Sequence, residues 1–174
     1  MPDGDQIRQR IYHLIGRIYT RVPFLARRWG RSFDALAFDT VPFAPMRKPL
    51  RDCRLALVTT GGVHTRAQPP FDMADPRGDP SYRAIAPDTP PEQLTITHDY
   101  YDHADAERDL NILLPIGLLR ELAEHGRIGG LGTCYSFMGH IEPPHVDTLL
   151  KQTAPQVAGL LKQARVDAVL LTPA

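Results

Sequence analysis

The sequence predicts an α/β fold with a mostly parallel sheet and flanking helices, preceded by a basic N-terminal helical arm. Short apolar runs typical of buried strands, such as Leu55–Thr60 and Val166–Ala174, are separated by stretches whose apolar residues recur at helical spacing. Strands and helices that alternate in this way favour parallel strands joined by right-handed crossovers. We therefore expect the arm in residues 1–50 and an α/β domain in residues 51–174.

The composition is that of one ordinary globular domain. The chain has 174 residues, of which 43% are apolar and 23% are charged, and its formal net charge is zero. Two cysteines, Cys53 and Cys134, are too few for a disulfide framework and form no CxxC pair. No apolar run approaches the length of a membrane span. We expect a cytoplasmic protein with no membrane span.

The arm begins with a predicted amphipathic helix over residues 5–21. Its apolar residues recur at helical spacing, and arginines occupy the other face. Residues 1–50 hold nine Lys/Arg against four Asp/Glu, so the arm is basic. Packing on the more acidic body is the simplest interpretation, and docking to an acidic partner or a lipid surface is the alternative. A second short helix is expected over Phe24–Trp29, and nucleic-acid binding is not expected.

The first half of the domain is predicted to hold two strands and a long loop. The apolar run Leu55–Thr60 closes with Gly61 and Gly62, as a buried strand followed by a tight turn does. Residues 65–92 are rich in proline and are interpreted as a long ordered loop. The alternating run Leu94–His98 predicts a second strand.

The second half is predicted to alternate helices and strands. Pro115 is suited to the start of a helix that ends near Gly126, and Asp109 and Asn111 before it are suited to capping. The glycine-rich segment 128–134 is interpreted as a strand with a bulge. Helical spacing over 146–161 crosses a proline that should kink the helix or start a second one, and the final strand follows.

Two segments could carry chemistry. The turn Thr59–Gly62 could bring backbone N–H groups close to a carboxylate or phosphate, although a plain strand-end turn explains it equally well. His64 would project from this end of the strand. The segment His98–Asp105 is dense in His and Asp, which suit zinc or iron, but its spacing matches no closed ligand set. A hydrogen-bonded polar loop is favoured, with proton transfer as the role of any working histidine.

Several segments together resemble one family, the selenoprotein B component of the glycine, sarcosine, betaine and D-proline reductases. The resemblance covers roughly residues 52–174. It rests on Leu57–His64, Gln68–Met73, Gly78–Arg83, Tyr101–His103, Asp109–Asn111 with Pro115, Tyr135–Ile141 and Asp167–Pro173.

The resemblance implies reductive cleavage of a carbon–nitrogen bond in a small amino acid or betaine, by one component of a multi-subunit reductase. On this hypothesis, His64 and His103 transfer a proton to the leaving amine. The substrate carboxylate is held by Thr59, Thr60, Gly61 and Gly62, and the site is oriented by Tyr101, Asp102 and Asn111. No metal or bound cofactor is expected in this chain.

The resemblance also implies a redox-active selenocysteine or cysteine immediately after Ala174. The sequence contains no such residue at that place, so we expect the domain to be incomplete at its C-terminus. One hypothesis is that an in-frame UGA codon was read as a stop, and a natural ending or an ordinary fragment boundary is the rival. Cys134 is expected to be a small core residue, because nothing in the sequence activates it.

Two other functions are compatible with the sequence. A non-catalytic module could keep the carboxylate-binding pocket and dock a partner subunit through the basic arm. A metal enzyme built on His98 and His103 is the third alternative.

Overall fold

The computed structural model describes residues 22, 24, 27–28 and 44–174. The chain divides into two compact units, residues 1–45 with 99–102, and residues 46–98 with 103–174. In the first unit, the predicted helix over residues 5–21 lies outside the described residues. The described residues Phe24, Arg27 and Arg28 are helical, in agreement with the short helix predicted there. The boundary predicted between residues 50 and 51 stays a prediction.

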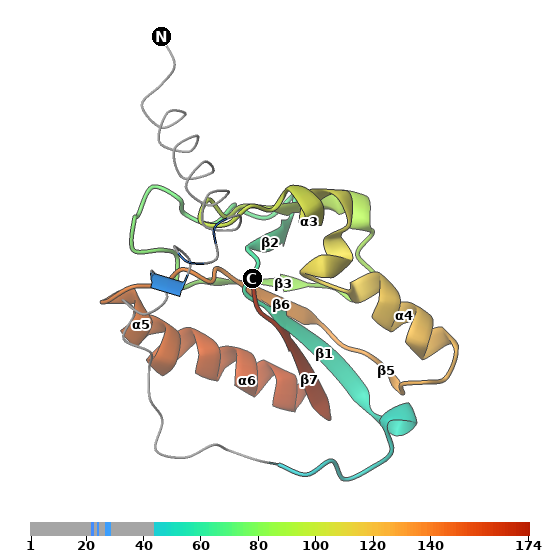
Figure 1. The fold of residues 1–174 in the computed structure, drawn as a ribbon. Coiled ribbons are helices and arrows are strands. Elements are labelled where there is room, and N and C mark those ends of the chain that lie inside the picture. Colours follow the sequence, from blue (N-terminus) through green and yellow to red (C-terminus); the bar gives the residue numbers. More distant parts are fainter. Residues whose placement is uncertain (1–21, 23, 25–26, 29–43) are drawn as a thin grey trace. The chain divides into compact units, whose positions relative to one another are not determined.

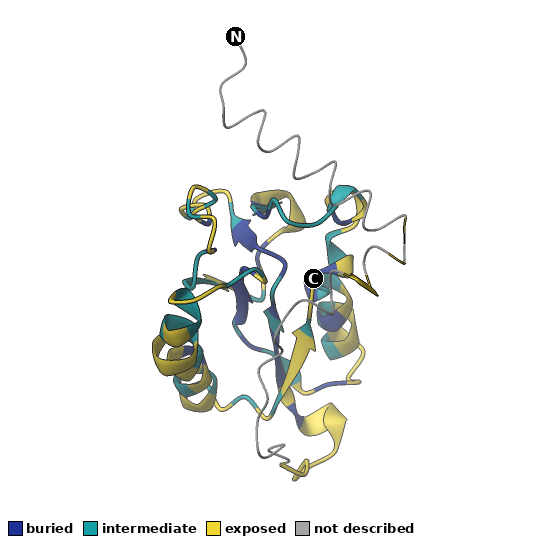
Figure 2. Ribbon diagram, turned by 60° about the vertical axis from the view of Figure 1, so that its left-hand side comes forward, coloured by how far each residue is buried: buried dark blue, intermediate teal, exposed yellow. Residues whose placement is uncertain are grey.

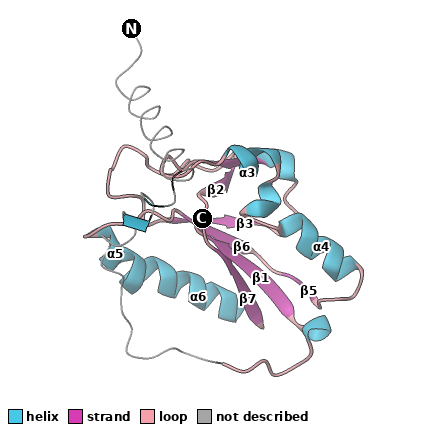
Figure 3. Ribbon diagram, viewed as in Figure 1, coloured by secondary structure: helices cyan, strands magenta, loops and turns pink. Residues whose placement is uncertain are grey.

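The second unit is an α/β domain, as predicted. Its strands are β1 (Arg54–Thr59), β2 (Val63–Thr65), β3 (Tyr82–Ile85), β4 (Leu94–Ile96), β5 (Gly130–Leu131), β6 (Cys134–Phe137) and β7 (Ala168–Thr172). Its α-helices are α3 (Ala104–Arg108), α4 (Ile116–Glu124), α5 (His145–Thr148) and α6 (Ala154–Gln163). Shorter helical turns are η1 (Leu50–Asp52), η2 (Pro91–Gln93), η3 (Leu110–Ile112) and η4 (Leu149–Thr153). Figure 3 shows how helices and strands are distributed along the domain.

β1 is the central strand of a mostly parallel sheet (Figure 1). On one side, β7 runs parallel to it over five residue pairs, from Leu55 with Ala168 to Thr59 with Thr172. On the other side, β1 pairs in parallel with both β5 and β6. β3 adds an antiparallel strand to the outer edge of β6. The predicted parallel sheet is thus confirmed, with one antiparallel strand that was not predicted.

β5 and β6 share β1 because the chain bulges between them. β5 pairs with the start of β1 and β6 with its end, and Gly132 between them donates its N–H to the carbonyl of Leu55 at 2.7 Å. A Cβ at Gly132 would lie 3.3 Å from the side chains of Arg54 and Val166. The glycine-rich segment 128–134 therefore forms the strand with a bulge that its composition predicts.

Helices cover both faces of the sheet (Figure 1). Val157 of α6 packs with Tyr135 and Phe137, which project from one face of β6. α4 contacts β5 and lies on the opposite side of the sheet from α6. Connections between parallel strands are right-handed, and this explains the placement. The chain moves across the sheet in one direction from β1 to β5 and in the opposite direction from β6 to β7. The helices of the two connections therefore lie on opposite faces.

The long segment 65–92 is ordered but is not entirely loop. It contains β3, whose Ile85 is fully buried and whose Tyr82 contacts Tyr135 edge-on at a centroid distance of 5.8 Å. The prediction of a loop was wrong at these four residues, and also at its two ends, where Thr65 belongs to β2 and Pro91 and Glu92 belong to η2. Prolines on both sides hid a strand too short for its alternation to stand out.

The predicted helix over 146–161 is interrupted as its proline suggests. α5 continues into a π-helical turn, η4, and α6 then begins with Pro155 in its first turn. Because proline lacks an N–H and clashes with the preceding turn, wider π hydrogen bonding immediately upstream accommodates it.

The final strand is not buried, contrary to the prediction. Val169, Leu170 and Leu171 of β7 are 39%, 43% and 68% exposed. Figure 2 shows β7 as an exposed strand beside the buried β1. Within the described residues, β7 pairs only with β1, so its outer edge has no neighbour. An apolar run indicates that a strand can be buried, but it does not show that the strand has a neighbouring strand on each side.

Candidate functional site

The carboxyl ends of β1 and β7 are joined by side-chain hydrogen bonds. The hydroxyl of Thr59 donates to the carbonyl oxygen of Thr172 at 3.1 Å, and the backbone N–H of Thr60 donates to the same oxygen at 3.2 Å. The N–H of Ala174 in turn donates to the hydroxyl of Thr60 at 3.0 Å. The chain leaving β7 therefore lies directly beside the turn that follows β1. In α/β proteins with parallel sheets, ligands bind beside the carboxyl ends of the strands.

The N–H groups of the turn already have acceptors within the protein. Gly61 donates to the hydroxyl of Thr59 at 3.1 Å, and Gly62 donates to the carbonyl of Phe137 at 2.9 Å. A carboxylate bound by these groups would have to displace an existing acceptor. The role predicted for Thr59–Gly62 in holding a carboxylate stays a prediction.

Gly62 brings this turn against the end of β4. Its φ is +66°, and a Cβ there would lie 2.5 Å from the carbonyl oxygen of Thr97 and 3.0 Å from Cβ of His98. The carbonyl of Gly62 also accepts the N–H of Thr97 at 3.0 Å. Only glycine meets both the backbone conformation and the close approach. His98 is thus held next to the end of β1.

His64 is buried, and both of its ring nitrogens are hydrogen-bonded. It lies within the short strand β2, with Nδ1 2.9 Å from the carbonyl oxygen of Thr65 and Nε2 2.8 Å from the hydroxyl of Thr97. A carbonyl oxygen only accepts, so Nδ1 carries a proton, whereas the Thr97 hydroxyl can either donate to Nε2 or accept from it. Both ring nitrogens of His64 are therefore held by the protein.

His98 is a buried imidazole beside two other histidines. It is 4% exposed, and its pKa is lowered to about 4, mainly by burial and to a smaller extent by the nearby His140 and His103. Burial acts in this direction because it disfavours the charged form. His98 is therefore a neutral ring at physiological pH, next to Gly62.

His103 lies at the N-cap of α3. Its Nδ1 is 2.8 Å from Oε1 of Glu107, one turn along the helix, and its side chain is 14% exposed. His103 contributes to the lowered pKa of His98, so the two imidazoles lie within electrostatic range of each other. The turn, His98 and His103 all belong to the second unit.

The other predicted site residues are placed differently. Tyr101 and Asp102 belong to the first unit, and both are half-buried. Asn111 lies in η3, where its amide Nδ2 donates to Oδ1 of Asp109 at 2.9 Å. Asp109 caps η3 by accepting the N–H of Asn111, whereas α4 begins after Pro115 at its N-cap. Asp109 caps a helix as predicted, but the helix it caps is η3 and not α4.

The described residues show no metal centre of three or more ligands. Groups of His, Cys, Asp and Glu arranged to hold a metal ion are absent from the described part of the chain. Cys134 is fully buried, and burial raises the pKa of its thiol to about 11. As the sequence predicts, it is a core residue and not an activated nucleophile. No described helix has the length and apolar character needed to cross a membrane.

Sequence reasoning did not assign His98 and His140 to the site of proton transfer. His98 ends the alternating run of β4, where a polar residue is ordinary, and His140 follows a glycine after β6. Their proximity arises only when the two segments fold against the same sheet edge. The one available indication was that His98 ends the predicted strand Leu94–His98, because functional side chains gather at strand ends.

Residues 26–174 match the family described as glycine/sarcosine/betaine reductase selenoprotein B. Among curated proteins, the chain is 37% identical over 131 residues to D-proline reductase subunit gamma of Acetoanaerobium sticklandii, covering 75% of the chain and 52% of that protein. It is 32% identical over 143 residues to glycine reductase complex component B subunit gamma of Carboxydothermus hydrogenoformans, covering 78% of the chain and 31% of that protein.

A further relative is the sarcosine reductase complex component B subunit beta of Peptoclostridium acidaminophilum. It is 28% identical over 117 residues, which cover 62% of the chain and 25% of that protein. The chain therefore spans about half the length of the first relative and less of the others. No solved structure matches the chain.

Proposed function

The chain belongs to the glycine/sarcosine/betaine reductase selenoprotein B family, and on that premise we propose that it is a component of a selenocysteine- or cysteine-dependent reductase. The proposed reaction cleaves the C–N bond of a small amino acid or betaine. Relatives named as subunits of D-proline, glycine and sarcosine reductases support this reaction and assembly with partner subunits.

The observation that carries the proposal is the junction between β1 and β7. Because the N–H of Ala174 donates to Thr60, a residue following Ala174 would lie beside the turn at Gly61 and Gly62. That turn contacts His98. A reactive group there would lie at the carboxyl ends of the parallel strands, where α/β proteins bind ligands, and imidazoles would lie nearby.

We propose that selenocysteine or cysteine directly follows Ala174. Its selenolate or thiolate would supply the nucleophile, since the deprotonated form is the reactive one. The hydrogen bonds of Thr60 with Ala174 and of Thr172 with Thr59 and Thr60 would fix the backbone that leads up to it. Sequencing the gene beyond the codon for Ala174 tests this placement. An in-frame UGA or a cysteine codon is expected, and any other codon contradicts it.

Proton transfer to the leaving amine is assigned first to His103. When the C–N bond breaks, its electron pair stays on nitrogen, and a proton delivered to that pair captures the departing amine as an ammonium ion. His103 is partly accessible, whereas both nitrogens of His64 are already hydrogen-bonded. Asn111 keeps its proposed role in orienting the site, and the roles of Tyr101 and Asp102 stay predictions.

Histidine substitutions in the complete complex test this assignment. His103→Gln is expected to lower kcat by about a hundredfold, the lower end of what general acid–base catalysis contributes. His125→Gln, an exposed histidine at the end of α4, is the matched control and should leave kcat unchanged. Unchanged kcat in His103→Gln would remove that residue from the mechanism. His64→Ala is also expected to lower turnover strongly, and unchanged turnover would exclude His64.

A subunit-docking role without catalysis is the second candidate. The exposed apolar side chains of β7, above all Leu171, favour it, because an unpaired apolar edge is suited to a partner. Turnover separates the two candidates: a docking module would leave turnover unaffected when His103 and the residue after Ala174 are both replaced.

A further inference from the structure

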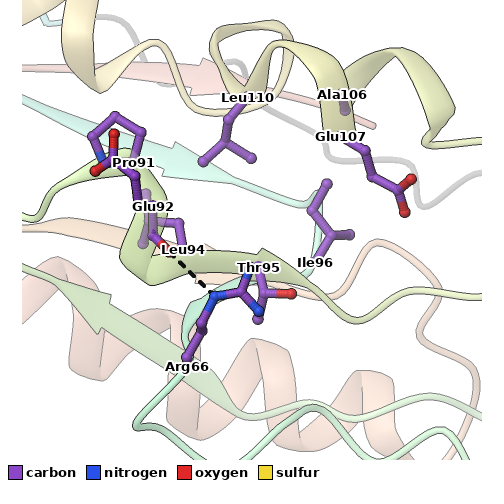
Figure 4. Close-up of a pocket in the computed structure, with 9 residues that line it drawn as sticks. All are labelled: Arg66, Pro91, Glu92, Leu94, Thr95, Ile96, Ala106, Glu107 and Leu110. Atoms are coloured by element: carbon purple, nitrogen blue, oxygen red, sulfur yellow. Dashed lines mark hydrogen bonds between the residues drawn. The ribbon is translucent and has the colours of Figure 1, made fainter.

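β2 and β4 pair as a two-stranded antiparallel ribbon, from Val63 with Ile96 to Thr65 with Leu94. We propose that a cleft between this β2–β4 ribbon and the α3–η3 segment binds a small zwitterion carrying a carboxylate and an ammonium group. The cleft has a volume of about 410 Å³ and lies entirely within the unit of residues 46–98 and 103–174. Natural ligand sites measure about 300–1,000 Å³, so this one is suited to a small molecule. Figure 4 shows the side chains that line it.

Arg66 gives the cleft its positive charge. Its Nε donates to the carbonyl oxygen of Glu92 at 3.2 Å, which orients the guanidinium. Within the described part of the chain, the two terminal nitrogens of Arg66 have no protein acceptor. Paired guanidinium N–H groups match the two oxygens of a carboxylate. Thr95 also lines the cleft and offers a hydroxyl donor.

Glu107 supplies negative charge elsewhere in the cleft. In Figure 4 it lies on α3, with Ile96 between it and Arg66. One of its oxygens pairs with His103 at 2.8 Å, and the side chain is 61% exposed. The other oxygen is available to accept from an ammonium group. Because Arg66 has no carboxylate partner among the described residues, the two opposite charges stand apart and do not neutralise each other.

The surface between the charges is apolar. Leu94 at its base is 4% exposed, and Ile96 and Leu110 complete the apolar lining. A molecule with a short hydrocarbon body could lie over these side chains while its two charged groups reach Arg66 and Glu107. A simple dianion is disfavoured, since the carboxylates of both Glu92 and Glu107 line the cleft and would repel it.

One contact between a carboxylate and an imidazole connects the cleft to the candidate site. Oε1 of Glu107 lies 2.8 Å from Nδ1 of His103, and His103 contributes to the lowered pKa of His98, which lies beside the turn after β1. The catalytic use of this cleft, as the place that holds the substrate carboxylate, rests on the proposed function. Binding of the zwitterion does not, because it depends only on the charges and the apolar lining.

Isothermal titration calorimetry on the full chain tests the binding with three ligands that share one ring size. D-Proline carries both charges, pyrrolidine only the cation and cyclopentanecarboxylate only the anion. D-Proline is expected to bind at least about tenfold more tightly than either of the others, because each charged contact contributes at least that factor. No binding of D-proline, or equal affinity for D-proline and cyclopentanecarboxylate, would overturn the proposal.

Variants locate the binding in this cleft. Arg66→Gln and Glu107→Gln are each expected to weaken D-proline binding by about tenfold or more, with circular dichroism used to check that both fold. Arg127→Gln and Glu124→Gln are matched controls, because both residues are exposed near the end of α4 and line no part of the cleft. Wild-type affinity in both cleft variants would overturn the proposal.

The two proposals fail in different ways. D-Proline binding that requires Arg66, in a complex that reduces no amino acid or betaine, would refute the proposed function alone. An active complex in which Arg66→Gln leaves both Kd and KM unchanged would refute the cleft alone.

Discussion

His145 and Asp75 are joined across 70 positions of the chain by a hydrogen bond of 2.7 Å between Nε2 and Oδ2. Neighbouring contacts strengthen this link: Glu142 donates its N–H to the carbonyl of Arg77 at 2.8 Å, and Nε2 of His140 lies 3.1 Å from the carbonyl of Pro76. Together they fix the long loop before β3 against the segment that leads into α5.

This link makes a prediction about acid stability. The hydrogen bond from His145 lowers the pKa of Asp75 below its usual 3.8, so the ionised carboxylate stabilises the fold at neutral pH, and this contribution is lost as pH falls through the lowered value. Asp75→Asn should therefore lower Tm at pH 7 but not at pH 2. Asp147→Asn, in an exposed pair with Lys151, is the control and should change Tm little. An equal loss of Tm for Asp75→Asn at both pH values would contradict this account.

The lowered pKa of His98 predicts a second dependence of stability on pH, in a higher pH range than that of Asp75. Its pKa of about 4 lies below the usual 6.5, so the unfolded chain binds the proton more readily, and stability falls as pH drops from 6.5 towards 4. Between pH 7 and pH 5 the loss should be about 2 kcal/mol, measured by urea unfolding. His98→Gln should abolish this dependence, while the exposed His125→Gln should keep it. Retention of the full dependence in His98→Gln would show that another group causes it.

Gly62 predicts a stability difference between two glycines with the same backbone conformation. Gly62 and Gly126 have φ of +66° and +65°, but only at Gly62 would a Cβ meet nearby backbone. Gly126→Ala should cost about 1 kcal/mol for the left-handed conformation alone. Gly62→Ala should cost at least about twice as much, because it adds the clash with Thr97. Equal free energies of unfolding for the two variants would mean that residues 97–98 do not press against the turn.

The exposed face of β7 predicts self-association. Leu171 is 68% exposed on a strand whose outer edge is unpaired within the described residues. Leu171→Lys should reduce concentration-dependent association in sedimentation experiments, because an edge charge opposes strand pairing. Leu118→Lys, at a 50% exposed position on α4, is the control for a general gain in polarity. Equal effects of both substitutions would assign the association to exposed apolar surface in general and not to β7.

The sequence predicts the elements whose pattern is local. β1 follows from an apolar run that is buried on both faces, and the bulge between β5 and β6 follows from closely spaced glycines. The exposure of β7 could not be predicted, because an apolar run carries no information about its neighbours. β3 was missed because four residues between prolines are too few to establish a period.

The candidate site was only partly predictable for the same reason. The glycine turn follows β1, and His103 lies at the start of α3. Such positions can be identified from the sequence alone. The cluster of His98 with His140 depends on two segments that meet only in the folded domain. The N–H groups of Gly61 and Gly62 donate to the hydroxyl of Thr59 and to the carbonyl of Phe137. Phe137 lies in β6, so this acceptor could be identified only once the strand order was known.

The most direct test of the proposed function is consumption of glycine, sarcosine, betaine and D-proline by an assembled complex containing this chain and its continuation. We predict that one of the four is consumed, and that replacing the selenocysteine or cysteine after Ala174 with serine abolishes consumption. Consumption that persists at the wild-type rate in the serine variant would contradict the proposal that the chemistry takes place at the end of β7.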